Sequence, residues 1–130
     1  MAAELVRQLV SPAVAIAAAF VIARQCRKPA WLPGRLVVRN MNTRHSRVTD
    51  WGLGHVRVEK SFTILDVGCG GGRTIQKLAA AARDGKVYGL DYAGASVAVA
   101  RDTNRQAIEE GRVNIRQGSV SQMPYADGTF

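Results

Sequence analysis

A glycine-rich segment, residues 66–72 (DVGCGGG), constrains the fold of this chain more than any other feature. It follows residues 62–67 (FTILDV), a short apolar run rich in strand formers, and precedes residues 74–83, whose apolar side chains recur at helical spacing. Glycines let the backbone turn sharply and let a ligand lie against bare main chain. The segment therefore predicts a strand, a tight turn and a helix, with a ligand site at the turn.

Two further strands are expected after the glycine segment. Residues 86–91 (KVYGLD) and 112–117 (RVNIRQ) have strand-like composition, and residues 93–111 between them have the apolar spacing of a helix. Strand, helix, strand, helix and strand in this order predict a parallel sheet with right-handed crossovers. The fold class is therefore α/β, with the sheet in residues 61–130.

Residues 1–28 predict an apolar helix ahead of the sheet. Ser11 is a favourable N-cap, Pro12 suits the first helical position, and Pro29 ends the helix. Residues 13–23 are apolar without a break. A helix that is apolar on all sides is either buried in protein or lies in lipid.

Three interpretations of this helix remain open. It packs on the protein's own domain, it contacts or enters a membrane through residues 9–28, or it belongs to a targeting segment or a mis-assigned start. Its uncharged stretch, residues 8–23, has 16 residues. That is fewer than the roughly 20 residues that cross a bilayer core.

Residues 29–60 are interpreted as a basic lead-in to the sheet. Pro33-Gly34 predicts a turn, and loops with a short helix over residues 49–58 are expected. Residues 1–60 hold ten Lys and Arg against three acids, whereas residues 61–130 hold eight against seven. Most of the net charge of +8 therefore lies in the first part of the chain.

A basic segment of this kind attracts nucleic acid, an anionic membrane surface or an anionic substrate, or it forms a solvated arm. Its two tryptophans, Trp31 and Trp51, do not alternate with the basic residues as a base-stacking surface requires. The sequence therefore argues against a nucleic-acid partner.

The residues around the glycines narrow the class of ligand. Counted from Gly68, the third glycine of a dinucleotide-binding G-x-G-x-x-G loop would fall on Arg73, and the lysine of a P-loop is also missing. Asp66 would repel phosphates and favours a cationic group. Asp91 ends the second strand, where a carboxylate accepts hydrogen bonds from ribose hydroxyls, and Tyr92 is placed to pack on a purine. The predicted ligand is an adenosine-like nucleoside with a cationic group, as in S-adenosylmethionine.

Residues 63–130 resemble the first half of a class I S-adenosylmethionine-dependent methyltransferase of the ubiquinone/menaquinone-biosynthesis type (methyltransferase type 11-like). The resemblance is carried by ILDVGCGGG at residues 64–72, by Asp91, and by residues 118–130 (GSVSQMPYADGTF), which are similar to the family's adenine-side loop. Ser119 stands where the family commonly has Asp. The resemblance implies a Rossmann-like parallel sheet that is truncated after its third strand.

The resemblance also implies which residues bind S-adenosylmethionine. The glycines would contact its methionine part, with Asp66 near the amino group; Asp91 would hold the ribose; and Tyr92 with two residues after the third strand would flank the adenine. The implied cofactor-binding set is Asp66, Gly68, Cys69, Gly70, Gly72, Asp91, Tyr92, Ser119 and Val120.

His45 in the lead-in is a candidate general base, and the alternative is a surface or packing histidine. Cys69 is interpreted as a small packing residue in the loop rather than a nucleophile, and no His or Cys spacing predicts a metal site. Cys26 is the other cysteine. Two cysteines in unrelated contexts exclude a disulfide framework and favour a reducing compartment such as the cytoplasm.

The function implied is methyl transfer to a small-molecule acceptor, with this chain as the cofactor-binding half. Because the resemblance places the far side of the cofactor cleft after Phe130, the chain alone is expected to be inactive or nearly so. Two alternatives are a non-catalytic fragment that binds S-adenosylmethionine and a membrane-associated fragment. The sequence predicts neither the oligomeric state nor the particular acceptor.

Overall fold

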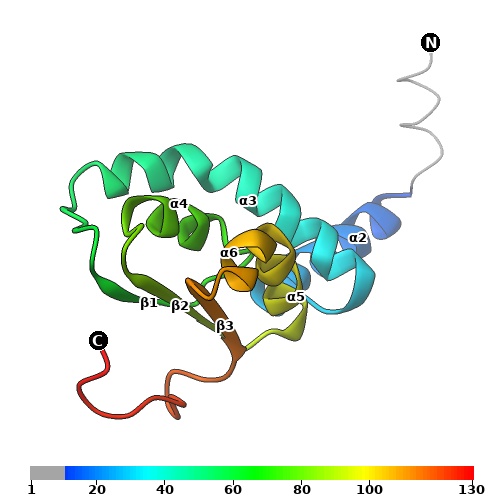
Figure 1. Cartoon of the computed structure of the whole chain (residues 1–130). Coiled ribbons are helices and arrows are strands. Elements are labelled where there is room, and N and C mark those ends of the chain that lie inside the picture. Colours follow the sequence, from blue (N-terminus) through cyan, green and yellow to red (C-terminus); the bar gives the residue numbers. More distant parts are fainter. Residues whose placement is uncertain (1–10) are drawn as a thin grey trace.

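A computed structural model describes residues 11–130 of the chain (Figure 1). The first ten residues lie outside the described part, and with them the beginning of the predicted segment 1–28 and residues 9 and 10 of the predicted membrane contact. The elements in chain order are α2 (Pro12–Arg27), α3 (Trp31–Leu53), β1 (Thr63–Val67), α4 (Arg73–Ala81), β2 (Lys86–Asp91), α5 (Gly94–Thr103), α6 (Arg105–Glu109) and β3 (Val113–Gln117).

The three strands form one parallel sheet in the order β1-β2-β3. Val67 of β1 is in register with Leu90, and Asp91 of β2 is in register with Gln117, so the carboxyl ends of the strands meet at one edge. The predicted parallel α/β sheet is confirmed, and β2 has the predicted bounds. Within residues 11–130, β1 pairs with β2 alone and is an edge strand.

Helices α3 to α6 lie on one face of the sheet, and the C-terminal segment, residues 118–130, lies on the other (Figure 1). On that second face the rings of Tyr88, Tyr125 and Phe130 pack edge to face, with centroids 5.1 to 5.7 Å apart. The core lies between the helices and the sheet. Its buried members include Ile75, Leu78, Ala79, Val87, Val97, Ala100, Val113 and Ile115.

The expectation of a turn and loops in the lead-in is wrong, because residues 31–53 form one continuous helix, α3. Pro33 lies in its first turn, where a missing backbone N–H costs no helical hydrogen bond. A Cβ on Gly34 would lie 2.7 Å from the carbonyl carbon of Pro29, so this glycine permits the close turn between α2 and α3. The Pro-Gly pair thus starts a helix here instead of interrupting the chain.

The predicted short helix over residues 49–58 is also wrong. Thr49 does not cap a helix; its hydroxyl donates to the carbonyl of His45 one turn earlier, within α3. The helix ends at Leu53, and Gly54 is its C-cap. The helix of the lead-in therefore extends through the residues that predicted turns, and it ends at a glycine.

The helix predicted over residues 93–111 is two helices, α5 and α6, which are separated at Asn104. The backbone of Asn104 has φ −113° and ψ 20°, outside the α-helical range. Its buried side-chain amide donates to the carbonyls of Ala100 and Gly72, both at 2.9 Å. A side chain that satisfies main-chain carbonyls in this way competes with helix continuation.

Helix α2 has the predicted start and end. The hydroxyl of Ser11 accepts from the N–H of Val14, Pro12 occupies the first turn, and Lys28 is the C-cap. The helix contacts α3, and none of its residues is buried. The interpretation that it packs on the protein's own domain stays a prediction. No helix within residues 11–130 is long and apolar enough to cross a membrane.

Candidate functional site

The glycine loop, residues 68–72, joins β1 to α4 at the carboxyl edge of the sheet. Gly68, Gly70 and Gly72 have φ of 73°, 52° and 77°, in the left-handed region that side chains disfavour. The N–H of Gly68 donates to the carbonyl of Leu90 at 2.7 Å, which ties the loop to the end of β2. A Cβ on Gly68 or Gly70 would meet no atom within 4 Å. The loop therefore presents bare main chain to open space.

Asp91 at the end of β2 is buried and holds the loop from the neighbouring strand. One carboxylate oxygen accepts from the N–H of Gly70 at 2.9 Å, and the other accepts from the N–H of Ala93 at 2.9 Å. Each carboxylate oxygen has two lone pairs, so Asp91 keeps acceptor capacity for further donors. The residue therefore positions the loop and remains able to bind hydroxyl groups.

Two asparagine side chains fix the carbonyls of the loop. Asn42 of α3 donates to the carbonyl of Gly71 at 2.8 Å, and Asn104 donates to that of Gly72 at 2.9 Å. Satisfying these carbonyls holds the loop between α3 and the α5–α6 junction. Sequence reasoning missed both residues, because no spacing rule connects an asparagine with a carbonyl 29 or 32 positions away.

Asp66 lies in β1 with one carboxylate oxygen buried and without a hydrogen-bond partner within the described residues. Burial, and next the negative charge of Asp91, raise the pKa of Asp66 from 3.8 to about 6. An ionised carboxylate here lacks a compensating group. A cationic group near Asp66 would supply that compensation, which is the chemistry predicted for this residue.

Two pockets border the loop and share Gly68. The loop pocket, of about 220 Å³, lies between α3 and the loop and is lined by Met41, Asn42, His45, Thr49, Gly68, Cys69, Gly70, Gly71, Arg73 and Thr74 together with Val38. The strand-end pocket, of about 180 Å³, is lined by Val67, Gly68, Leu90, Asp91, Tyr92, Gly118, Ser119 and Val120. Each is smaller than the roughly 300–1,000 Å³ of a typical ligand pocket, so each fits one part of a ligand.

The strand-end pocket brings together four of the predicted cofactor-binding residues, Asp91, Tyr92, Ser119 and Val120. The loop pocket brings together Gly68, Cys69 and Gly70. Gly72 lies away from both pockets. It is the N-cap of α4 and is buried against α5. The assignment of these residues to a cofactor stays a prediction.

Cys69 is a packing residue. It is buried in the core cluster beneath the loop, and burial raises its pKa to about 12, with the charges of Asp66 and Asp91 adding to the shift. A thiol with this pKa is protonated at neutral pH, and the thiolate is the nucleophilic form. The interpretation that Cys69 is not a nucleophile agrees with this environment.

Helix α3 brings His45 into the loop pocket. Lys77 of α4 holds the helix there: its ammonium donates to the carbonyl and hydroxyl of Ser46, both at 2.8 Å, and pairs with Asp50. His55 is placed differently, since its ring lies beside the carbonyl of Trp51 at 2.7 Å at the end of the helix. Of the two histidines, His45 is the one that borders the loop.

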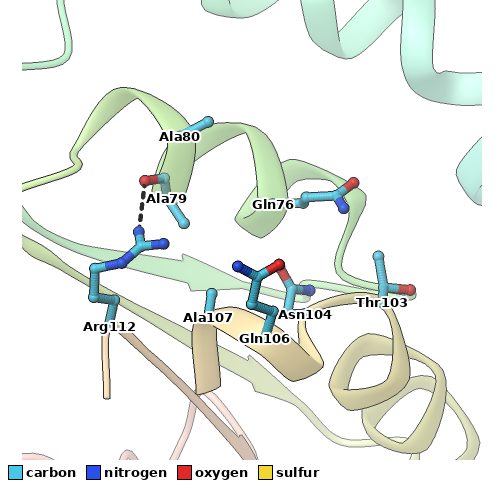
Figure 2. A pocket seen from close by; sticks show the side chains of 8 residues that line it. All are labelled: Gln76, Ala79, Ala80, Thr103, Asn104, Gln106, Ala107 and Arg112. Atoms are coloured by element: carbon cyan, nitrogen blue, oxygen red, sulfur yellow. Dashed lines mark hydrogen bonds between the residues drawn. The ribbon is translucent and has the colours of Figure 1, made fainter. Parts of the chain in front are cut away.

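A third pocket, of about 260 Å³, lies between α4 and the α5–α6 region (Figure 2). Amide side chains of Asn104 and Gln106 line it, with Arg112 at one end. The guanidinium of Arg112 already donates to the carbonyl of Ala79 at 3.0 Å and to Glu110. Ligands of open α/β sheets bind at the carboxyl ends of the strands, so this pocket in the helical layer is not the expected site.

A parallel sheet with a glycine loop after β1 and a carboxylate at the end of β2 defines an α/β domain with a ligand site at its carboxyl edge. Comparison with known proteins identifies the family. Residues 64–130, just over half of the chain, match the methyltransferase domain family. The chain belongs to this family.

Two curated relatives carry methyltransferase names. An O-methyltransferase from Pyrenophora dematioidea is 32% identical over 78 residues, which are 60% of this chain and 29% of that protein. A demethylmenaquinone methyltransferase from Bacillus mycoides (strain KBAB4) is 40% identical over 74 residues, 56% of this chain and 31% of that protein. The chain spans less than a third of the length of these relatives.

Solved structures show the same fold. A SAM-dependent methyltransferase from Aquifex aeolicus superposes with a TM-score of 0.60 at 21% identity, over 72% of this chain and 51% of that one. At this identity the likeness concerns the fold alone. It agrees with the class I, Rossmann-like sheet expected from the sequence.

Proposed function

We propose that this chain binds S-adenosylmethionine and is the cofactor-binding part of a methyltransferase for a small-molecule acceptor. The observation that carries the proposal is the meeting of three features at one sheet edge: the open main chain at Gly68, the Asp91 carboxylate and the unpartnered Asp66. Family membership supports methyl transfer. The name of one curated relative, the demethylmenaquinone methyltransferase, supports a small-molecule acceptor.

The two pockets suggest how the cofactor is divided. The loop pocket would take the methionine part, because Gly68 and Gly70 present main chain there. Asp66 lines neither pocket, but it lies in β1 two residues before Gly68, where a carboxylate suits a cation. The strand-end pocket would take the nucleoside, with Asp91 accepting from the ribose and Tyr92 packing on the base. The hydroxyl of Ser119 would meet the polar edge of the adenine.

When bound, S-adenosylmethionine supplies an activated methyl group. The chain's own contribution is to hold the donor so that an acceptor approaches in line. His45 borders the loop pocket and is proposed to take a proton from an acceptor that must lose one. In any active methyltransferase that contains this chain, His45→Asn is expected to lower turnover at least tenfold and to leave S-adenosylhomocysteine binding unchanged. Weakened binding with normal turnover would instead make His45 a binding residue.

We propose that the 130-residue chain alone binds the cofactor but turns over little. The open edge of β1 supports this, since β1 has no strand partner on that side among the described residues. The same edge supports the second candidate, a binding chain without catalysis of its own. A labelled-methyl assay on the chain tests both proposals, because both expect little turnover. Turnover comparable to that of longer relatives would contradict them.

We further propose a cytoplasmic location. Cys26 is exposed and Cys69 is buried, and both are free thiols. An exposed free thiol is stable in a reducing compartment. Recovery of the protein with Cys26 oxidised from cells grown without oxidant would contradict this proposal.

Isothermal titration with S-adenosylhomocysteine tests the binding proposal. The wild-type chain is expected to bind, and Asp91→Asn is expected to weaken binding by roughly tenfold or more, because a hydrogen bond to a charged acceptor contributes about 1.5–3 kcal/mol. Asp84→Asn, an exposed carboxylate in a turn, is the matched control and should bind normally. Absence of binding by the wild-type chain, in a sample shown to be folded by circular dichroism, would overturn the proposal.

A further inference from the structure

The N-terminal helical hairpin exposes apolar side chains in a way that the rest of the described chain does not. The described chain, residues 11–130, has 17 exposed large apolar residues, and eight of them lie between residues 14 and 36. In α2 these are Val14, Ile16, Phe20, Val21 and Ile22, and in the first turns of α3 they are Trp31, Leu32 and Leu36. Exposed apolar side chains that gather in one part of the chain mark a place of interaction.

Cations surround this apolar surface without acids. Residues 11–49 contain seven Arg and Lys and no Asp or Glu. Within residues 11–130, no carboxylate forms an ion pair with Arg24, Arg27, Lys28 or Arg35. The charges near the apolar residues are therefore free to meet an anionic surface.

A hollow at the end of α2 combines both features. It has a volume of about 680 Å³, and Phe20 and Ala23 line it beside the cations Arg24, Arg27 and Lys28. Apolar groups next to several cations match the boundary between acyl chains and anionic headgroups of a bilayer. This combination is poor for a second copy of the chain, because pairing the same face would bring the cations together.

Trp31 stands at the turn between the two helices. The residue is 88% exposed, and its backbone has φ 54°, in the left-handed region that non-glycine residues rarely adopt. Tryptophan is enriched at membrane interfaces, where its apolar ring and its N–H both find suitable surroundings. The turn thus exposes Trp31, a residue type suited to membrane interfaces, between an apolar helix and a cluster of cations.

We propose that α2 and the first turns of α3, the α2–α3 surface, dock on an anionic lipid bilayer. The docking is at the surface of the bilayer, with the apolar side chains in the acyl boundary and the cations at the phosphates. The hydroxyl of Tyr92 donates to the carbonyl of Arg27. This contact joins the α2–α3 surface to the strand-end pocket, which Tyr92 also lines.

Vesicle flotation with the whole 130-residue chain tests the proposal. Binding is expected to vesicles of phosphatidylcholine with about one third phosphatidylglycerol, to weaken with salt, and to be much weaker with phosphatidylcholine alone. Replacing the three cations of the hollow by Gln should lower the affinity roughly 100-fold, given about 1 kcal/mol for each. The matched control replaces three cations outside the surface, Arg57, Lys60 and Arg105, and should keep most of the affinity.

Tryptophan fluorescence locates the contact. In Trp51→Phe the remaining reporter is Trp31, and its emission is expected to shift to the blue when anionic vesicles are added. In Trp31→Phe the remaining reporter is Trp51, which is expected to stay at its solvent wavelength. A shift of Trp51 alone would place the contact elsewhere and overturn the proposal.

Three other results would also overturn it: no flotation with anionic vesicles, equal flotation with neutral and anionic vesicles, or a dimer in sedimentation velocity whose formation buries Trp31 without lipid. S-adenosylhomocysteine titration of the same samples reports on folding and on the cofactor site. Failure of lipid binding with intact cofactor binding therefore refutes the docking surface and leaves the proposed function standing.

Discussion

The N-terminal hairpin, residues 12–36, and the sheet domain, residues 63–117, use the same apolar residue types in opposite surroundings. Ile16 in α2 is 71% exposed, whereas Ile75 in α4 is fully buried. The hairpin has cations and no acids, and the sheet domain has two buried or half-buried carboxylates at its site. Apolar content alone therefore does not show whether a helix stabilises the fold or provides a surface.

The largest effect is expected from truncating the two isoleucines. Ile75→Ala should lower the free energy of unfolding by about 2–5 kcal/mol, because it removes a buried side chain and leaves a cavity. Ile16→Ala should change it by no more than about 0.5 kcal/mol. Urea unfolding followed by circular dichroism measures both. An equal loss of stability would show that α2 is packed in solution and that the two regions do not differ in this respect.

Two glycines of the loop are expected to have different roles, Gly72 in packing and Gly68 in ligand contact. Gly72→Ala should cost about 3 kcal/mol, since it combines left-handed strain with a Cβ 2.6 Å from Asn104 and 2.9 Å from Ala100. Gly68→Ala has the strain alone, about 1–2 kcal/mol, because its Cβ meets open space. Thermal unfolding with S-adenosylhomocysteine titration should find Gly68→Ala the more stable variant of the two, yet impaired in binding. Normal binding by Gly68→Ala would remove this glycine from the site.

Asp66 makes stability depend on pH. Its folded pKa of about 6 lies above its ordinary value of 3.8, so the folded state holds the proton more tightly and stability falls as pH rises through this window. The loss reaches at most about 3 kcal/mol. Asp66→Asn replaces the titrating carboxyl by a neutral amide of similar shape. It should flatten this part of the dependence of stability on pH, measured by urea midpoints from about pH 4 to about pH 7. An unchanged slope would assign the effect to another group.

The smallest effect concerns the contact between α3 and the glycine loop. Asn42→Ala removes the donor to the Gly71 carbonyl and should cost about 1 kcal/mol, with faster amide exchange in the glycine loop. Thr43→Ala, the exposed neighbour whose hydroxyl bonds back to Arg39 within the helix, is the control. Hydrogen exchange that rises equally in both variants would mean that α3 does not hold the loop.

Local patterns predicted the sheet because strands and tight turns are encoded in short segments. Residues 86–91 carry the composition of a strand and end in Asp91, and both features lie where expected. The lead-in failed for the opposite reason: Pro33 and Gly34 are turn formers in isolation, but here they fit the first turn of a helix that packs closely on α2. A short sequence pattern does not include information about the helix that packs against it.

Local periodicity and the conformational freedom of glycine were sufficient to predict the order of strands and helices along the chain, the glycine turn and the acids at the strand ends. Only the tertiary structure decided that the apolar side chains of α2 face outward, that Asn42 and Asn104 hold the loop from two sides, and that the Tyr92 hydroxyl bonds to α2. The physical reason is that these arrangements depend on contacts between residues 29 to 65 positions apart, which no local pattern contains.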